Sequence, residues 1–435
     1  MSGGGSDFPR AGVRLRTLCA VLGYALGASA HATNGVNVIG FGFESGGMGG
    51  ADIAVARDAN GLNINPAGLT QIHASSFEFV FGAAFADDVG HQDQMGNDLD
   101  VDQRVIPAGT TSYARRINDS VVVGIGLFAQ GGSGAVYESF NSPFGGRDRL
   151  EAKLGIARLS AGAGWQVGEH WSLGAALTLN YARLEQKIFP SASVFNPADP
   201  QASFFGSSTD DMSSTRVGYK LGAQYAPNDN LRFGLNYSAK RSLPFTGEMT
   251  FNLSSIGLGR VRYNDVELES IGLPEEVGLG MAWQATPKLL LAADVSWLRW
   301  SDVIKKQTLR ARGPSNPAAP AVLELPDQNL DWHDQYVFAL GAQYQWSDKL
   351  HLYAGFNYGA NPIPARNSNP LLLIMGEKHL TAGVRYQLDG GWYVGAFAEY
   401  LMQIKVHYNN PQLPFGPSVD ETGYLGVSIV VGGQW

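Results

Sequence analysis

Apolar and polar side chains alternate with a period of two along most of the chain that follows residue 74. The alternation is clearest in residues 171–182, where one face carries large apolar side chains and the other carries small or polar ones. A period of two is the signature of a β-strand whose two faces meet different surroundings. The sequence therefore predicts an all-β structure of many strands. The same pattern recurs in residues 231–238, 336–346, 380–388 and 424–435.

Three features of these strands favour a membrane β-barrel over a soluble β-sandwich. Aromatic residues bracket the apolar face, as Trp171 and Tyr181 do, and such girdles lie at the two membrane interfaces. The opposite face is small and polar, which suits a crowded interior. Connections alternate between short and long, as in outer-membrane barrels. Short turns are expected near residues 118–119, 169–170, 227–230, 286–287, 347–349 and 389–391, and long links near 87–102, 132–150, 189–212, 254–263, 313–329, 361–370 and 408–419.

The strands between these links number about fourteen, and an even number is expected of a single-chain bacterial barrel. The barrel must be closed, because an open sheet edge in hydrocarbon would leave backbone amides unpaired at a cost of several kcal/mol each. Since about eight strands already enclose a space that side chains fill, a barrel of about fourteen strands needs something more inside it.

Residues 33–74 are the available candidate for this interior, as an N-terminal hatch or plug. The stretch shows neither sustained alternation nor a long apolar run, and it is rich in glycine, including Gly46, Gly47, Gly49 and Gly50. It ends in Asn65-Pro66-Ala67-Gly68, which predicts a turn from plug to barrel because proline fixes φ and glycine permits positive φ. The glycines suit either a movable hatch or tight packing. Residues 75–435 would then form the transmembrane β-barrel.

The composition agrees with this architecture. Of the 435 residues, 16% are charged, 11% are aromatic and 55 are glycine. No stretch reaches the roughly 18 apolar residues of a membrane-spanning helix. A net charge of −8 gives no support to nucleic-acid binding, which normally shows a basic patch.

Residues 1–32 are predicted to be a secretory signal peptide. A basic region precedes a short apolar stretch at 18–28, and cleavage is expected after Ala32, or alternatively after Ala30. The single cysteine, Cys19, would leave with this peptide. The basic region consists of Arg10, Arg14 and Arg16.

Several short motifs follow one another in an order that resembles the FadL family, the outer-membrane transporters of long-chain fatty acids and other hydrophobic compounds. The resemblance covers nearly all of the chain after the signal peptide. It implies a hatch inside the barrel, ligand binding in the lumen, and sideways release into the membrane beside an inward-kinked third strand. It also implies a monomer in the Gram-negative outer membrane, surrounded by lipid and lipopolysaccharide. The motifs are Ser45-Gly46-Gly47-Met48-Gly49-Gly50-Ala51, Asp58, Asn65-Pro66-Ala67-Gly68, Trp171-Ser172, Tyr181-Ala182-Arg183, Leu273-Pro274-Glu275, Trp300-Ser301, Asp334-Gln335-Tyr336 and Pro362-Ile363-Pro364.

The third strand is predicted to begin near Ser120 and to run into a glycine-rich stretch with Gly131, Gly132 and Gly134. Glycine there suits a bulge that breaks the pairing of the wall and makes a lateral opening. The start of a loop is the alternative.

A fatty carboxylate needs a cationic partner. The resemblance points to Arg183 in the Tyr-Ala-Arg motif. It points less directly to Lys305 and Lys306, which follow Trp300-Ser301 near a ligand-linked lysine of the family but are not at the same position in the motif. Arg183 shares its parity with Tyr181 on the outward face. A solvated arginine beyond the bilayer is therefore the alternative.

The sequence thus predicts a passive transporter that takes up hydrophobic molecules, with long-chain fatty acids as the expected cargo and monoaromatic hydrocarbons as the alternative. A general diffusion porin is a further alternative, although a porin needs no plug. No cofactor, metal site or enzymatic activity is expected, because no catalytic or metal-binding motif supports an outer-membrane hydrolase. His333 beside Asp334 suits a hydrogen-bonded rim histidine better than acid–base chemistry. Inward-facing Arg385 and Glu399 are expected to hold the plug by ion pairs.

Overall fold

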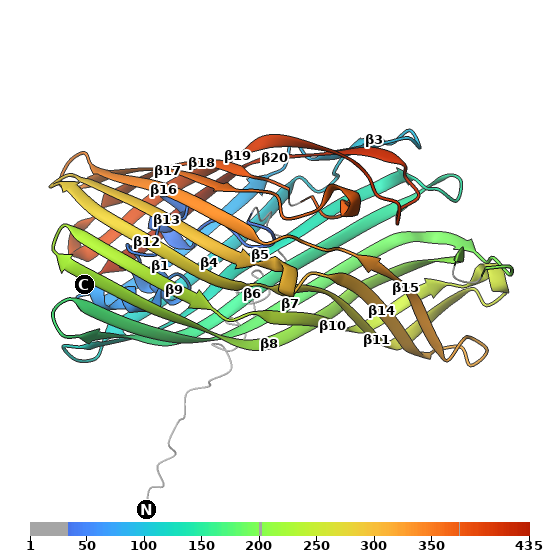
Figure 1. The fold of residues 1–435 in the computed structure, drawn as a ribbon, viewed down its shortest axis with the longest axis horizontal. Coiled ribbons are helices and arrows are strands. Elements are labelled where there is room, and N and C mark those ends of the chain that lie inside the picture. The colour runs from blue at the N-terminus through green and yellow to red at the C-terminus, as the bar shows by residue number, and fades with distance from the viewer. Residues whose placement is uncertain (1–33, 200–201, 374) are drawn as a thin grey trace, which may run out of the picture.

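The structure is a computed structural model that describes residues 34–199, 202–373 and 375–435. The predicted signal peptide, its cleavage sites and Cys19 lie outside the described residues. The described chain forms one closed antiparallel β-barrel with fourteen positions in its wall (Figure 1), which confirms the predicted fold class. The barrel closes where β1 pairs with β20, from Ser76↔Gln434 to Phe85↔Leu425. Ten wall positions are single strands: β1 Ser75–Phe85, β4 Val105–Arg116, β5 Val121–Asn141, β6 Arg147–Val167, β7 Trp171–Val194, β8 Phe204–Asn228, β17 Leu350–Gly359, β18 Lys378–Gln387, β19 Trp392–Asn409 and β20 Pro417–Gln434.

The other four wall positions each consist of two strand segments that follow one another along the same path. Pro274 makes one of these interruptions, since it has no backbone N–H to donate to the neighbouring strand. A further pair, β2 Gly90–Asp93 and β3 Asp98–Asp100, forms a hairpin in the link between β1 and β4. The interrupted positions are β9 Leu231–Ser238 with β10 Arg241–Asn252, β11 Arg260–Leu273 with β12 Glu275–Thr286, β13 Leu289–Arg299 with β14 Lys306–Pro314, and β15 Val322–Asn329 with β16 Gln335–Gln345.

The two ends of the barrel differ as predicted. All six expected short turns lie at one end, and the long links lie at the other. The strands at the long-link end reach farther than predicted. The link expected at 132–150 is reduced to 142–146, because β5 and β6 continue as a paired ladder to Asn141↔Arg147.

The alternation along the strands separates an exposed apolar band from a buried interior. On β7, the outward Leu177 is 68% exposed whereas the neighbouring Thr178 is 2% exposed. On β8, the outward Val217 is 70% exposed. Large apolar side chains at this level of exposure are the expected surface of a barrel that faces lipid.

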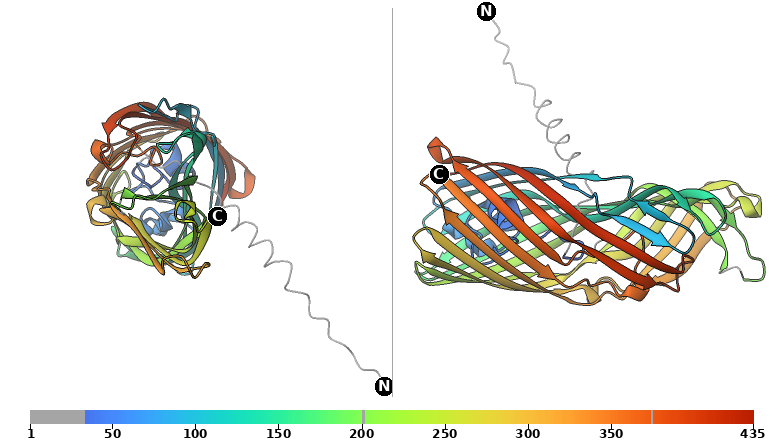
Figure 2. Two further views of the ribbon diagram at one scale, coloured as in Figure 1. Left: turned by 90° about the vertical axis from the view of Figure 1, so that its right-hand side faces the viewer. Right: turned by 90° about the horizontal axis from the view of Figure 1, so that it is seen from above.

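Residues 34–74, here called the inner segment, lie within the ring of strands, towards the end with the short turns (Figure 2). The segment contains the short helix α2 Gly42–Gly47 and the 3-10 turns η1 Ala59–Leu62 and η2 Pro66–Gln71. Across the described residues, no helix has both the length and the apolar character needed to cross a membrane. The remaining 3-10 turns are η4 Ser254–Ile256, η5 Trp300–Asp302, η6 Ala365–Asn367 and η7 Asp389–Gly391.

Buried carboxylates of the wall hold the backbone of the inner segment. Asp294 on β13 accepts hydrogen bonds from the backbone amides of Asp52 at 2.6 Å and Ile53 at 2.8 Å. Glu78 on β1 accepts one from the amide of Phe43 at 2.9 Å. These bonds satisfy amides that have no backbone acceptor inside the barrel: those of Asp52 and Ile53 in irregular chain, and that of Phe43 in the first turn of α2.

Glycines on both sides allow the inner segment to approach the wall closely. A Cβ atom on Gly355 of β17 would lie 2.2 Å from the carbonyl carbon of Met48, and one on Gly49 would lie 2.9 Å from the backbone nitrogen of Phe356. At the end of the segment, Asn65 caps η2 by accepting a hydrogen bond from the amide of Ala67, and Pro66 occupies the first turn. The turn predicted at residues 65–67 therefore leads directly to β1.

Candidate functional site

A largely apolar cavity lies between the inner segment and the long links. This outer cavity has a volume of about 500 Å³. Val36 of the inner segment lines it, as do side chains from β6, β7, β8, β11, β14 and β15 and from the links around residues 371 and 413. Six aromatic side chains are among those that line it: Phe144, Phe189, Phe204, Phe205, Trp332 and Phe415.

The charges around the outer cavity are unsuited to an anion. Among the described residues that line it, the only one with a formal charge is Asp327, and none is a lysine or an arginine. Lys306 Nζ lies 2.7 Å from Asp327 Oδ2, so this carboxylate already has a cationic partner. An apolar ligand gains about 0.8 kcal/mol for each CH₂ group that such a cavity removes from water.

The structure places Arg183 on the outer surface of the barrel, away from the outer cavity. Its guanidinium lies 3.3 Å from Glu185 and 3.5 Å from Asp211, while its neighbour Leu184 lines the cavity. The side chains of β7 keep alternating between the outer face and the interior beyond the apolar band, and Arg183 is on the outer face. This position agrees with the alternative of a solvated arginine, and a role for Arg183 as a ligand contact stays a prediction.

Lys305 and Lys306 do not line the outer cavity either. Both side chains are exposed, and Lys306 approaches the cavity only through Asp327. The wall strand is interrupted at η5, which turns Ile304 and Gln307 towards the cavity instead.

The glycines predicted to kink the third strand lie where β5 leaves its neighbour β4. The two strands pair only from Thr111↔Leu127 to Arg116↔Val122. Beyond Leu127, β5 shifts its register with β6 between Ala129 and Gly131, and Gly131 forms a bridge with Asn37 of the inner segment. Gly134 continues the ladder opposite Lys153.

Residues 105–110 of β4 and 128–135 of β5 do not pair with each other, and this unpaired stretch of the wall is here called the gap. The register shift of β5 beside it is here called its bend. A side cavity of about 120 Å³ lies at this gap, lined by Thr110 of β4 and Ala129 of β5 among others. Val38 and Ile39 of the inner segment also line it. Because Val36 lines the outer cavity, residues 36–39 form the partition between the two cavities.

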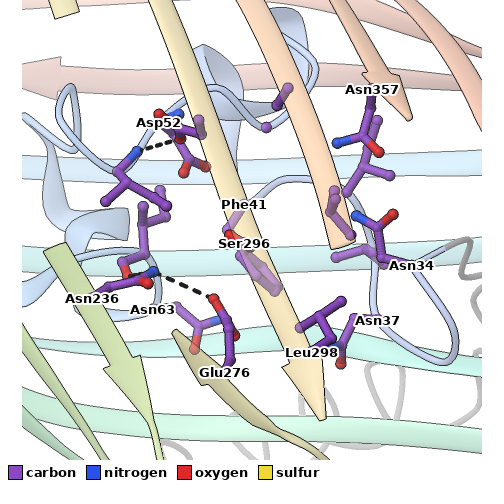
Figure 3. Close-up of a pocket in the computed structure, with 18 of the residues that line it drawn as sticks. Asn34, Asn37, Phe41, Asp52, Asn63, Asn236, Glu276, Ser296, Leu298 and Asn357 are labelled. Atoms are coloured by element: carbon purple, nitrogen blue, oxygen red, sulfur yellow. Dashed lines mark hydrogen bonds between the residues drawn. The ribbon is translucent and has the colours of Figure 1, made fainter. Parts of the chain in front are cut away.

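A small polar cavity of about 80 Å³ lies beneath this partition (Figure 3). Asn34, Asp52 and Asn63 of the inner segment face Asn236 and other side chains of the wall there. The polar lining makes this inner cavity a poor path for an apolar molecule.

The other residues singled out in the sequence lie outside the outer cavity and contact the wall or the inner segment. His333 and Asp334 are both exposed, and Asp334 accepts a hydrogen bond from the amide of Ser301. Arg385 lies 3.7 Å from Glu44 of the inner segment, as predicted. Glu399 instead pairs with His379 of β18 at 2.9 Å, so its predicted role in holding the plug is wrong.

Sequence reasoning missed the aromatic wall of the outer cavity and a buried histidine beside it. Phe189, Phe204 and Phe415 were placed in long links, and aromatic residues in a link are a signal of burial that could have been used. His91 lies in the link after β1, and its ring is bracketed by Asp93 and Asp420, which is 329 residues away in the sequence. No local pattern reveals such a contact.

Comparison with known proteins agrees with this architecture. Residues 20–425 match the model of a family described as outer membrane protein transport protein (OMPP1/FadL/TodX). The long-chain fatty acid transport protein of Salmonella typhi is 22% identical over 401 residues, which cover 86% of this chain and 89% of that protein.

Solved structures show the same fold. The toluene transporter TbuX of Ralstonia pickettii has a TM-score of 0.73 at 20% identity, covering 92% of this chain and 99% of that one. A FadL homologue of Pseudomonas aeruginosa has a TM-score of 0.73 at 17% identity, with the same coverage. The apolar band, the closed wall and the family match all place the protein in the outer membrane. The chain belongs to the OMPP1/FadL/TodX family of outer-membrane transport proteins.

Proposed function

We propose that this protein takes up uncharged hydrophobic compounds, with small aromatic molecules as the best fit, and that the outer cavity is where they bind. The observation that carries this proposal is the aromatic, cation-free lining of that cavity among the described residues. A carboxylate ligand would gain no ion pair there, and it would lie near Asp327. Small aromatic molecules therefore come before long-chain fatty acids, the reverse of the order expected from the sequence.

We propose that bound molecules leave sideways, through the gap between β4 and β5, into the membrane. The partition at residues 36–39 stands between the outer cavity and the side cavity, so a movement of this part of the inner segment would join them. Sideways exit lets an apolar molecule enter lipid without crossing water. Passage down a concentration gradient needs no energy source, and a monomer contains every element of the path.

The inner segment argues against a general diffusion porin. It places buried side chains such as Phe43 and Leu62 across the lumen, where a porin has an open aqueous channel. Planar-bilayer recordings should therefore show small conductance. A large steady conductance would favour the porin.

Long-chain fatty acids are the second candidate, favoured by the relatives at 22% identity that are long-chain fatty acid transport proteins. The test compares a long-chain fatty acid with its methyl ester, which has the same chain and no charge. At about pH 8 the ester should bind the purified protein at least as tightly as the acid, because no cation compensates the desolvation of the carboxylate. Acid binding about tenfold tighter than ester binding would reverse the assignment. Mass spectrometry of ligands retained during purification would identify the natural compound.

A further inference from the structure

The hairpin formed by β2 and β3 bridges the wall above the gap between β4 and β5. Its strand β2 pairs with β20 from Gly90↔Glu421 to Asp93↔Ser418. On its other side, the amide of Asn141 at the outer end of β5 donates to Asn97 Oδ1 at 2.7 Å. The bridging hairpin, residues 90–100, therefore joins β20 to β5 at a height where β4 and β5 do not pair.

A continuous chain of polar side chains runs through this hairpin. Asp420 Oδ1 on β20 lies 2.6 Å from His91 Nδ1, and His91 Nε2 lies 3.2 Å from Asp93 Oδ2. Asp93 Oδ2 in turn accepts a hydrogen bond at 2.8 Å from Asn97 Nδ2, the side chain that reaches Asn141. His91 is the central link, and its side chain and those of both aspartates are fully buried.

Both ring nitrogens of His91 face carboxyl oxygens, and when Asp93 and Asp420 are both ionised, both nitrogens carry a hydrogen in the two bonds. The ring is then an imidazolium. Burial would lower the pKa of His91, but the hydrogen bonds to Asp420 and Asp93 and their negative charge raise it above its usual value. Burial would likewise raise the pKa of Asp93, whereas its hydrogen bonds with His91 and Asn97 lower it.

His91 titrates together with the groups packed around it. Burial raises the pKa of Asp420, whereas its hydrogen bond with His91 and the charge of that ring lower it. Tyr137 of β5 lies with its ring 6.4 Å from the imidazole, and Tyr408 of β19 lies beside Asp420. A phenol ordinarily titrates near pH 10. Asp100 and Asp102 lie near Tyr137. On the outer side, Lys405 and Glu421 pair with each other at 2.7 Å.

His91 also contacts the aromatic wall of the outer cavity. Its ring stacks on Phe140, with centroids 5.4 Å apart and planes at 29°, and it meets Phe415 edge-on at 6.1 Å. Phe140 is fully buried and packs on Phe189 at 5.9 Å. Because Phe189 and Phe415 line the cavity, His91 lies directly behind the surface that a ligand would touch.

We propose that His91 is a positioning residue for ligand binding: clamped between Asp93 and Asp420, it holds the bridging hairpin across the gap and Phe415 at the cavity wall. This inference rests on the function proposed above. The clamp is complete below the pKa of His91. As pH rises through that pKa, the neutral ring keeps one N–H, one carboxylate loses its hydrogen bond to the ring, and the two buried carboxylates no longer have a cation between them. The hairpin then loosens and ligand exchanges faster.

The test follows the dissociation of N-phenyl-1-naphthylamine, an uncharged aromatic fluorophore, from the purified protein by stopped flow. For the wild-type chain, dissociation should be roughly tenfold faster at about pH 9 than at about pH 6, as expected for loss of a hydrogen bond to a charged group. His91→Gln should dissociate fast at both values. His407→Gln is the matched control, since His407 lies exposed on β19, and it should keep the wild-type profile.

A second measurement separates the clamp from a general effect on folding. Gln92 and Val419 face each other across β2 and β20, at a spacing that suits a disulfide. The Gln92→Cys/Val419→Cys pair, once oxidised, should remove the pH dependence and restore slow exchange to His91→Gln. If the fluorophore dissociates from the wild-type protein at the same rate at both pH values, the role of His91 is overturned and the proposed function is not. A wild-type protein that binds no fluorophore at either pH would overturn the proposed function as well.

Discussion

The backbone amide of Gly132 donates a hydrogen bond to the carbonyl oxygen of Val36 at 3.0 Å, which ties the bend of β5 to the inner segment. The same Val36 lines the outer cavity. A residue of the wall and a residue of the interior thus share one contact at the partition between the two cavities. A ligand that displaced the backbone of Val36 would break this bond, so we expect filling of the outer cavity to act on the bend of β5.

Alanine at Gly131 should impair this contact without disturbing the rest of the barrel. A Cβ atom there would lie 1.8 Å from the carbonyl oxygen of Val36, so the inner segment would have to move away at a cost of about 1–3 kcal/mol. Uptake of toluene by cells should change several-fold for Gly131→Ala. Gly383→Ala on β18 is the control, because a Cβ there meets nothing closer than 3.2 Å and the residue lies away from the gap. Equal uptake by both variants would show that the bend of β5 has no part in uptake.

The carboxylate of Asp294 should be a main anchor of the inner segment. Asp294→Ala leaves the amides of Asp52 and Ile53 buried without their acceptor, which should lower the free energy of unfolding by about 2–5 kcal/mol. The variant should also conduct more current in planar bilayers. Asp389→Ala, in an exposed turn at the other side of the wall, should leave both measurements unchanged. Unchanged unfolding and conductance in Asp294→Ala would show that the inner segment is held by other contacts.

Two neighbouring residues of β7 test which face carries the ligand. Leu184→Ala should weaken binding of an aromatic probe by roughly three- to tenfold, because it removes apolar surface from the outer cavity. Arg183→Ala should leave binding unchanged, because its guanidinium lies on the outer face with Glu185 and Asp211. Titration of both purified variants, by the fluorescence of the bound probe, decides the point. The opposite ranking would restore Arg183 as a ligand contact.

The alternation of side chains predicted the wall well and the site poorly, for physical reasons. Where lipid meets β7, the pattern is strict: Leu177 is exposed and Thr178 is buried, as expected. Beyond the apolar band that constraint disappears. Charged Glu151 and Lys153 then pair with each other on β6, and the strands continue with no pattern to mark them.

The outer cavity is built in this region, from segments that are far apart in the sequence. Phe189 belongs to β7 and Phe415 to the link before β20, yet their rings lie 6.3 Å apart. The interruption at η5 turns Ile304 inward and leaves Lys305 outside, a change of face that period-two counting does not anticipate. The bend of β5 had a local signal in the glycines near Gly131, and the aromatic residues of the long links were a weaker one. Its role as a lateral opening stays a prediction.

A covalent link across the gap between β4 and β5 would test whether the ligand leaves sideways. Thr110 of β4 and Ala129 of β5 both line the side cavity, and Thr110→Cys/Ala129→Cys can be joined by a short, cleavable, bifunctional thiol reagent. Cells with the joined barrel should stop taking up toluene, the purified joined protein should still bind it, and cleavage of the link should restore uptake. Unchanged uptake with the link in place would contradict sideways release.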